Sequence, residues 1–229
     1  MVIYQAGYYL IKVNKFDKGP KKDFESLTAT SCINQNLLNT SCFYWSSDAK
    51  NIAKTAQDFT LTEKEISEIH AWVDQRFKAK ELGWPNLFYS LECLNDYKAA
   101  FFTDRTDLVS LSLSFTESES KKLIKDFKPQ SGHTGEVGLY KMLKQNIPEN
   151  PDGIFIGYDL IQPELDGSFH SIHCRLTKDE LKNELRLTLN EHGLFEENAS
   201  WEKIINYCNN ESNGLTGAGP WYYCKIRKY

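Results

Sequence analysis

Long apolar runs are missing from this 229-residue sequence, and their absence excludes several classes of protein. No stretch of about 18 apolar residues occurs, so the sequence predicts no membrane span. The first 12 residues lack a basic start and a small-residue cleavage site, and Gln5 and Gly7 interrupt them. We expect a first strand there and not a signal peptide, and therefore a cytoplasmic protein with no membrane association.

Metal-type cysteine spacing is missing as well. The six cysteines include no Cys-x-x-Cys pair, the spacing typical of structural zinc and of thioredoxin-like redox sites. Without export, thiols stay reduced, and we expect these to be small buried hydrophobic side chains. A Cys32–Cys42 bridge would require export by another route. The sequence predicts no metal and no cofactor.

An excess of basic residues is also lacking. Lys and Arg total 27 against 31 Asp and Glu, which gives a net charge of -4. Residues 146–229 hold 8 basic and 13 acidic side chains, and 8 minus 13 is -5. Because phosphate contacts require an excess of Lys and Arg, we expect no nucleic-acid partner. The acidic half favours a basic protein partner, with a merely solubilising role as the alternative.

The patterning predicts an α+β fold, with a mainly antiparallel or mixed sheet and helices packed on one side. In residues 108–115, apolar residues alternate with serines, which predicts a strand with one buried and one solvated face. Capping boxes predict helix starts at Thr62, Thr116 and Thr177. Further strands are expected at 8–16, 87–94, 99–103, 154–161, 168–175 and 221–227, and a further helix at 198–209.

The chain is expected to form a single domain, 1–229, with two possible lobes at 1–146 and 147–229. The boundary is residues 147–153, which hold two Pro and one Gly. No internal repeat at a solenoid period is found.

The segment 169–174 contains the residues best suited to catalysis. On a strand, His170 and Cys174 share one face and His173 points to the other, which argues against a metal site. A thiolate–imidazolium pair of Cys174 with His170 or His192, oriented by Asp159, would suit a hydrolase or transferase. The alternative is a buried free thiol.

A glycine-bearing loop at residues 132–138 allows two interpretations. It could hold a phosphate at the start of a helix, although it is no Walker loop. In the alternative, Thr134 caps that helix and Gly138 lets it pack closely against the sheet.

The C-terminal strand combines aromatic and basic residues. Strand periodicity places Trp221, Tyr223, Lys225 and Arg227 on one face, with Tyr222, Cys224 and Ile226 on the other. At a sheet edge, the first set would form a surface of the kind enriched in interface hot spots. In the alternative, Trp221 packs beneath a loop.

Four segments of the last third of the chain stand out together: Gly157-Tyr158-Asp159, Phe169-His170-Ser171, residues 189–195 and Pro220-Trp221-Tyr222. In these segments the chain resembles small cytosolic bacterial proteins, some of which are immunity proteins of polymorphic-toxin or contact-dependent-inhibition systems. The resemblance implies a cognate toxin domain, bound stoichiometrically and often through acidic side chains, and it assigns no binding residue.

The leading hypothesis is therefore a cytosolic protein-binding module, in its specific form an immunity protein that neutralises a basic toxin by occluding its active surface. The alternative is a small-molecule hydrolase or transferase that uses Cys174 and His170. The expected partner contacts are Glu164, Asp166, Glu196, Glu197, Trp221 and Tyr223.

Overall fold

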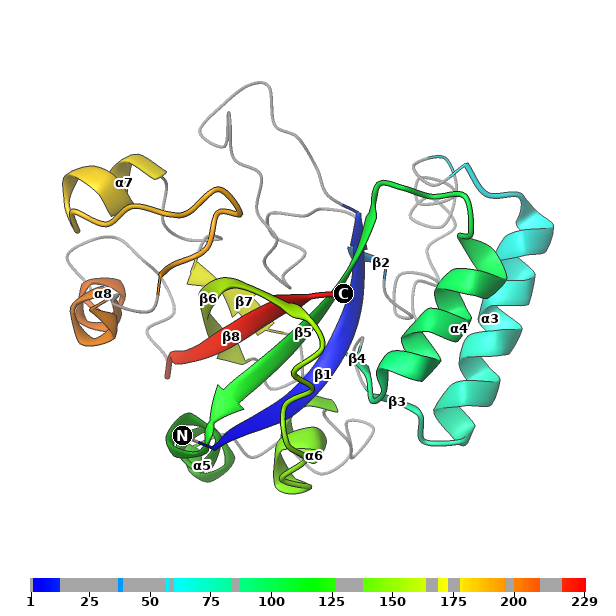
Figure 1. Ribbon diagram of the computed structural model, residues 1–229, viewed down its shortest axis with the longest axis horizontal. Helices are drawn as coiled ribbons and strands as arrows, with labels where there is room; N and C mark the ends of the chain where they lie inside the picture. Colours follow the sequence, from blue (N-terminus) through cyan, green and yellow to red (C-terminus); the bar gives the residue numbers. More distant parts are fainter. Residues whose placement is uncertain are drawn as a thin grey trace.

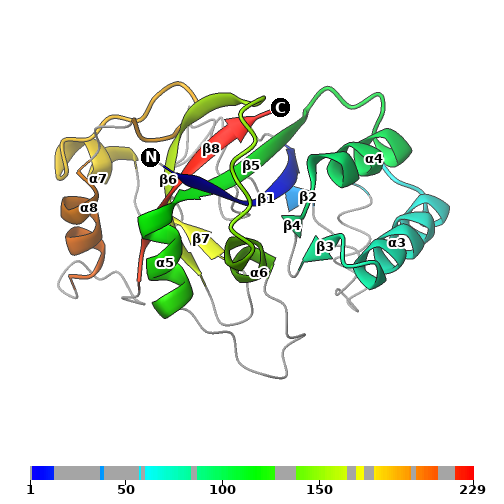
Figure 2. The same ribbon diagram turned by 60° about the horizontal axis from the view of Figure 1, so that its bottom comes forward.

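The structure is a computed structural model of the chain, and it combines one curled antiparallel sheet with flanking helices (Figures 1 and 2). It describes residues 2–12, 37–38, 57, 60–83, 87–126, 138–163, 169–172, 178–196, 200–210 and 220–229. The α+β class and the mainly antiparallel sheet are confirmed. Within the described residues, no helix has the length and apolar character that a membrane crossing requires.

The strands follow the order β3-β4-β1-β5-β8-β6-β7, and β2 also pairs with β1. Every pair is antiparallel. Three strands separate β1 from β7 in the sheet, yet Tyr9 of β1 meets Phe169 of β7 edge to face with ring centroids 5.7 Å apart. This contact shows that the sheet is curled. The strands are β1 (Ile3–Lys12), β2 (Leu37–Leu38), β3 (Leu82–Gly83), β4 (Leu87–Phe88), β5 (Leu108–Thr116), β6 (Ile154–Pro163), β7 (Phe169–Ser171) and β8 (Tyr222–Lys228).

Helices cover both faces of the sheet, whereas the sequence pattern suggested one. Tyr9 and Ile11 of β1 point to the concave face, which α5 and α6 cover, while Tyr8 and Leu10 point to the opposite face and pack with α3 and α4. On that second face, α7 and α8 cover β6 at the other end of the sheet. The helices are α3 (Glu63–Lys78), α4 (Leu91–Phe101), α5 (Glu117–Asp126), α6 (Gly138–Lys144), α7 (Lys178–Asn183) and α8 (Trp201–Cys208).

Helix α3 begins at the predicted capping box. The Thr62 N–H donates to the Glu65 carboxylate at 2.7 Å, and the Glu65 N–H donates to the Thr62 hydroxyl at 3.2 Å. At Thr116 only half of the box forms, because the Glu119 carboxylate accepts from Tyr223 N instead of reaching back. The box at Thr177 lies outside the described residues.

The strands expected at 87–94 and 99–103 were wrong. Strand β4 covers only two residues, and α4 follows it. The Ser90 hydroxyl starts this helix by accepting from Cys93 N at 3.1 Å. Cys93 and Tyr97 then lie one turn apart on the buried side, so the aromatic composition of the segment reflects a buried helix and not a strand.

The serine face of β5 is buried, contrary to the expectation of a solvated face. Ser110, Ser112 and Ser114 are at most 3% exposed. The crossover segment, residues 147–153, lies over this face on its way from α6 to β6 (Figure 1). The hydroxyl groups therefore face protein groups and not solvent.

A pseudo-two-fold axis relates β1 and β5 to β6 and β8. β1 carries a bulge at Gly7 and β6 carries one at Gly157, with φ of 143° and 142°. Leu113 of β5 corresponds to Ile226 of β8, and these two residues also pair with each other, so the axis passes between them. The matching pairs are Gln5–Ser114 with Phe155–Arg227, Gly7–Leu113 with Gly157–Ile226, Tyr9–Leu111 with Asp159–Cys224, and Ile11–Val109 with Ile161–Tyr222.

The outer neighbours of the two bulged strands match as well. In each half a Leu-Phe pair packs on the bulge: the Phe pairs with the Tyr that follows the glycine, and the Leu side chain fills the space that a glycine Cβ would need. The corresponding residues are Gly7 and Gly157, Tyr8 and Tyr158, Leu87 and Leu194, and Phe88 and Phe195. The residues between the two halves include the expected lobe boundary at 147–153. The single-domain and lobe assignment stays a prediction.

Candidate binding surface

Strand β8 has the two faces that its sequence predicts, but it is not an edge strand. Tyr222, Cys224 and Ile226 belong to the core on the concave side. β8 lies between β5 and β6. Trp221 is 1% exposed, so it is buried as the alternative interpretation expects, but it packs with β6, α7 and α8 and not beneath a loop. Of the two aromatic residues expected on the surface, Tyr223 alone is partly exposed.

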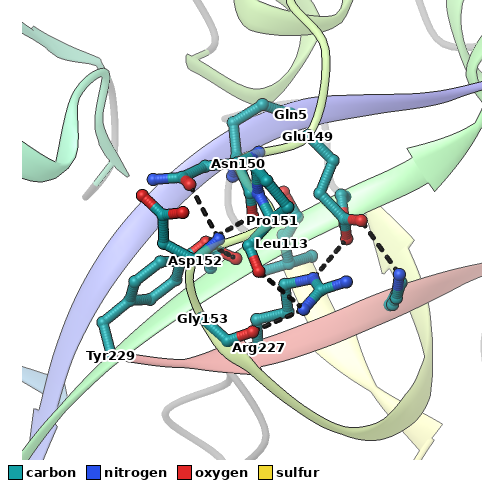
Figure 3. A network of polar contacts seen from close by, with 12 residues as sticks. Gln5, Leu113, Glu149, Asn150, Pro151, Asp152, Gly153, Arg227 and Tyr229 are labelled. Carbon is teal, nitrogen blue, oxygen red and sulfur yellow. Dashed lines mark hydrogen bonds and ion pairs between the residues drawn. The ribbon is translucent and has the colours of Figure 1, made fainter.

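A charged network joins the crossover segment to β8 (Figure 3). The Glu149 carboxylate accepts from the Ser114 hydroxyl at 2.6 Å and from Lys225 Nζ at 2.9 Å, and it lies 3.0 Å from Arg227 Nε. Burial raises the pKa of Glu149, but the contacts with Arg227, Ser114 and Lys225 outweigh it and leave the pKa below its usual value. One carboxylate therefore neutralises part of the charge of two cations beneath the segment.

The remainder of the crossover segment is fixed by hydrogen bonds to its backbone carbonyl groups. Arg227 Nη1 donates to the carbonyls of Pro151 and Gly153. The Tyr229 hydroxyl donates to the Asn150 carbonyl at 3.0 Å, and its ring lies where a Cβ on Gly153 would be. Figure 3 shows these groups gathered between β1 and β8. The crossover segment is therefore packed on the face of the sheet and is not a free linker.

An aromatic patch lies beside this network, formed by Phe155, Tyr158, Trp201 and Tyr223. Trp201 stacks on Tyr223 with ring centroids 5.2 Å apart and an interplanar angle of 7°. Tyr158 meets both Trp201 and Phe155 edge to face. Lys225 Nζ lies 5.3 Å from the Phe155 ring centroid, within the range of a cation–π contact. The patch therefore runs without interruption from α8 to the start of β6.

The end of this patch is apolar and open to solvent. Phe155, on the face of the patch, is 41% exposed, and Ile154, which points to the opposite face, is 70% exposed. Glu196 is exposed too, and it follows Phe195, which pairs with Tyr158 on the outer side of β6. The acidic residue predicted at position 196 therefore adjoins the outer side of β6 near Gly157.

A buried carboxyl group lies on the opposite, concave face. Asp159 is 0% exposed, and its Oδ1 accepts from the Ser171 hydroxyl at 2.7 Å and from Leu160 N at 2.8 Å. Burial raises the pKa of Asp159 to about 7, and these two hydrogen bonds offset only part of that rise. Cys224, its partner across β6 and β8, is also fully buried.

The described residues do not show how the groups of the catalytic alternative are arranged. His170 lies on β7, partly buried, while Cys174 and His173 lie outside the described residues. The described cysteines, Cys93, Cys208 and Cys224, are buried free thiols, as the sequence predicts. Burial raises the pKa of Cys93 to about 12 and that of Cys224 well above its usual value, so neither suits a nucleophile. The Cys174–His170 hypothesis stays a prediction.

A metal site and the glycine-bearing loop are the two other features considered from the sequence. Within the described residues, no group of three or more His, Cys, Asp or Glu side chains is arranged to hold a metal ion. Residues 132–137 lie outside the described part. Gly138 begins α6, where its added Cβ would lie 3.1 Å from Gly83 Cα, so the close-packing role expected for Gly138 is confirmed.

The six expected partner contacts divide into three groups. Glu164, Asp166 and Glu197 lie outside the described residues, Trp221 is buried, and the last two are accessible, Tyr223 within the patch and Glu196 next to Phe195. The sequence reasoning missed Phe155 and Trp201. The signal for Phe155 was present: Gly-Tyr-x-Leu-Ile occurs at 7–11 and again at 157–161, which identifies 154–156 as the start of a second bulged strand.

The chain was compared with models of protein families, with curated proteins and with solved structures, and none of the three comparisons gives a match.

Proposed function

We propose that this protein is a protein-binding module whose contact surface is the aromatic patch, extended around the edge of β6 by Ile154, whose side chain points to the opposite face of the sheet. The observation that supports this function is the exposure of Ile154 and Phe155 beside the stacked pair of Trp201 and Tyr223. Trp and Tyr dominate interface hot spots. Tyr223 and Phe155 come from paired strands, so binding would order little additional chain.

The charges around the patch favour a basic partner. Glu196 and Glu202 are exposed at its border, next to Phe195 and Trp201. Two cations beside the patch, Lys225 and Arg227, are engaged with Glu149, and Lys203 on α8 donates to the Leu185 carbonyl. Carboxylates at the rim of an interface mainly raise the association rate, whereas desolvated aromatic groups determine the dissociation rate.

The finer form of the proposal is a cytoplasmic immunity protein that occludes the active surface of a basic toxin. Its support is the resemblance described above and the acidic C-terminal half. Such a role requires a tight one-to-one complex, and a nanomolar complex corresponds to about 12 kcal/mol. Two or three aromatic hot spots of about 2 kcal/mol or more would supply a substantial share of that affinity.

Affinity capture from the native lysate, followed by kinetics with the purified partner, tests this function. Phe155→Ser is expected to raise the dissociation rate about 30-fold, the equivalent of about 2 kcal/mol. Glu196→Lys is expected to slow association in a manner that high salt removes. Glu92→Lys, an exposed site on α4, is the matched control. Binding that Phe155→Ser and Tyr223→Ala both leave unchanged would contradict the proposal.

A further inference from the structure

The two pseudo-equivalent halves differ at the outer edge of the bulged strand. On β1 this edge is occupied by the chain itself: Gln5 N donates to the Ile147 carbonyl at 2.8 Å, and Glu149 N donates to the Ile3 carbonyl at 3.0 Å. These two bonds flank an antiparallel bridge between Tyr4 and Pro148. Residues 147–149 are thus a short added strand.

Among the residues that the structure describes, the corresponding edge of β6 has no paired strand, although the Gly153 carbonyl, which corresponds to the Ile3 carbonyl, already accepts from Arg227 Nη1. Tyr4 pairs with Phe115 as Ile154 pairs with Lys228, so residues 153–155 of β6 correspond to 3–5 of β1. In the described part of the chain, no strand or bridge pairs with 153–155 on the side away from β8. Farther along the same side, Asn190 Nδ2 donates to the Ile156 carbonyl at 2.7 Å, and Phe195 pairs with Tyr158. The opening is therefore bounded at one end.

We propose that this opening takes an extended segment of a partner protein as an added antiparallel strand, in the position that residues 147–149 occupy on β1. This inference rests on the proposed protein-binding function and specifies how the partner binds. In strand addition, main-chain hydrogen bonds provide affinity and alternate side chains provide specificity. Here the Phe155 N–H corresponds to the Gln5 N–H, which donates outward on β1.

The side chains around the opening specify the segment that fits. Ile154, 70% exposed, lies at the middle position, where Tyr4 faces Pro148 in the other half. An apolar residue opposite Ile154 would cover it. Glu196, exposed next to the bridge that bounds the opening, favours a Lys or Arg in the same segment. A second copy of this chain fits less well, because it would bring another Glu196 to the same edge.

The test uses the full chain and a phage-displayed library of random linear peptides of about ten residues. Enriched peptides are expected to combine apolar residues with Lys or Arg. One selected peptide is then synthesised in two forms, N-methylated at odd or at even amides. Because alternate N–H groups of a strand point to the same side, one form should lose binding at least tenfold and the other should retain it.

Variants of the chain locate the peptide. Phe155→Pro removes the outward N–H at an edge position, where proline is tolerated, and is expected to weaken binding at least tenfold. Val2→Lys, at an exposed apolar residue of the other half, should leave binding unchanged. If circular dichroism shows that Phe155→Pro does not fold, the comparison of the two N-methylated peptides alone tests strand addition.

Each other outcome overturns the proposal in a recognisable way. If no peptide is enriched, the proposal of strand addition is refuted. Peptides that bind equally in both N-methylated forms but lose affinity in Tyr223→Ala would show recognition by side chains alone, which leaves the proposed function standing. A concentration-dependent dimer that Phe155→Pro abolishes would place a second copy on the edge.

Discussion

Asp159 should make the stability of this protein depend on pH near neutrality. Its carboxyl group is completely buried, and burial raises its pKa from 3.8 to about 7. An acid with a raised pKa in the folded state holds its proton when the unfolded chain has already released it. The contribution of Asp159 to the free energy of unfolding is therefore largest at low pH, and it falls as pH rises from the unfolded pKa to the folded one.

The size of this effect follows from the two pKa values. Each pKa unit corresponds to about 1.4 kcal/mol, so a rise of about three units corresponds to about 4 kcal/mol in total. Between about pH 5 and about pH 8 the expected loss is about 2.5 kcal/mol. This equals a shift of about 1 M in the urea midpoint for a slope of 2–3 kcal/mol per molar, approximately that of a small protein.

The variant Asp159→Asn isolates this contribution, because an amide oxygen can still accept from Ser171 and Leu160 N. Urea unfolding followed by tryptophan fluorescence should show that the variant lacks the loss of about 2.5 kcal/mol. Glu119, whose pKa burial also raises, contributes a slope that both proteins share. Glu202→Gln, at an exposed carboxylate, should behave as the parent protein does. Equal pH dependence in Asp159→Asn and the parent would refute the reasoning.

Three further predictions concern the elements that hold the surface. Glu149→Gln leaves Lys225 and Arg227 without their carboxylate and should lower the free energy of unfolding by about 3 kcal/mol in urea titrations; an effect below about 1 kcal/mol would contradict the network. Gly7→Ala and Gly157→Ala should each destabilise by more than about 2 kcal/mol, because both glycines have positive φ and abut Leu87 and Leu194; tolerance of either change would show that the two bulges are not equivalent. Thr62→Ala removes the cap of α3 and should cost about 1 kcal/mol, and an unchanged urea midpoint would count against it.

Local signals in the sequence predicted the local structure well. Helix α3 followed from a capping box and a stripe of Ile66, Ile69 and Val73, because both act within a few residues along the chain. The alternation of β8 predicted its faces correctly for the same reason. Helix α4 was not predicted, because apolar and aromatic residues favour a strand. Ser90 and the spacing of Cys93 and Tyr97 nevertheless indicate a helix.

Features that depend on distant contacts were not predictable in this way. The serines of β5 looked solvated, but residues 147–153, far along the chain, cover them. The pattern at the C-terminus suggested a surface position for Trp221 because it does not reveal where β8 lies in the sheet. The central position of β8 is set by its pairing with β5 and β6, which are distant in the sequence. The exposed end of the patch at Phe155 could be recognised only by comparing β6 with β1, which requires noticing a repeat between widely separated segments.

The path of the crossover segment explains why, in the described part of the chain, only one of the two equivalent edges is paired. Ser112 and Ser114 on β5 correspond to Lys225 and Arg227 on β8, so both cations of the central face come from one half. A single carboxylate, Glu149, meets them from the crossover segment. That segment must lie close enough to β8 for the ion pairs while its backbone bonds to Ile3 and Gln5 of β1. Because the segment then runs directly into β6, it covers the edge of the first half and cannot also cover the equivalent edge of the second.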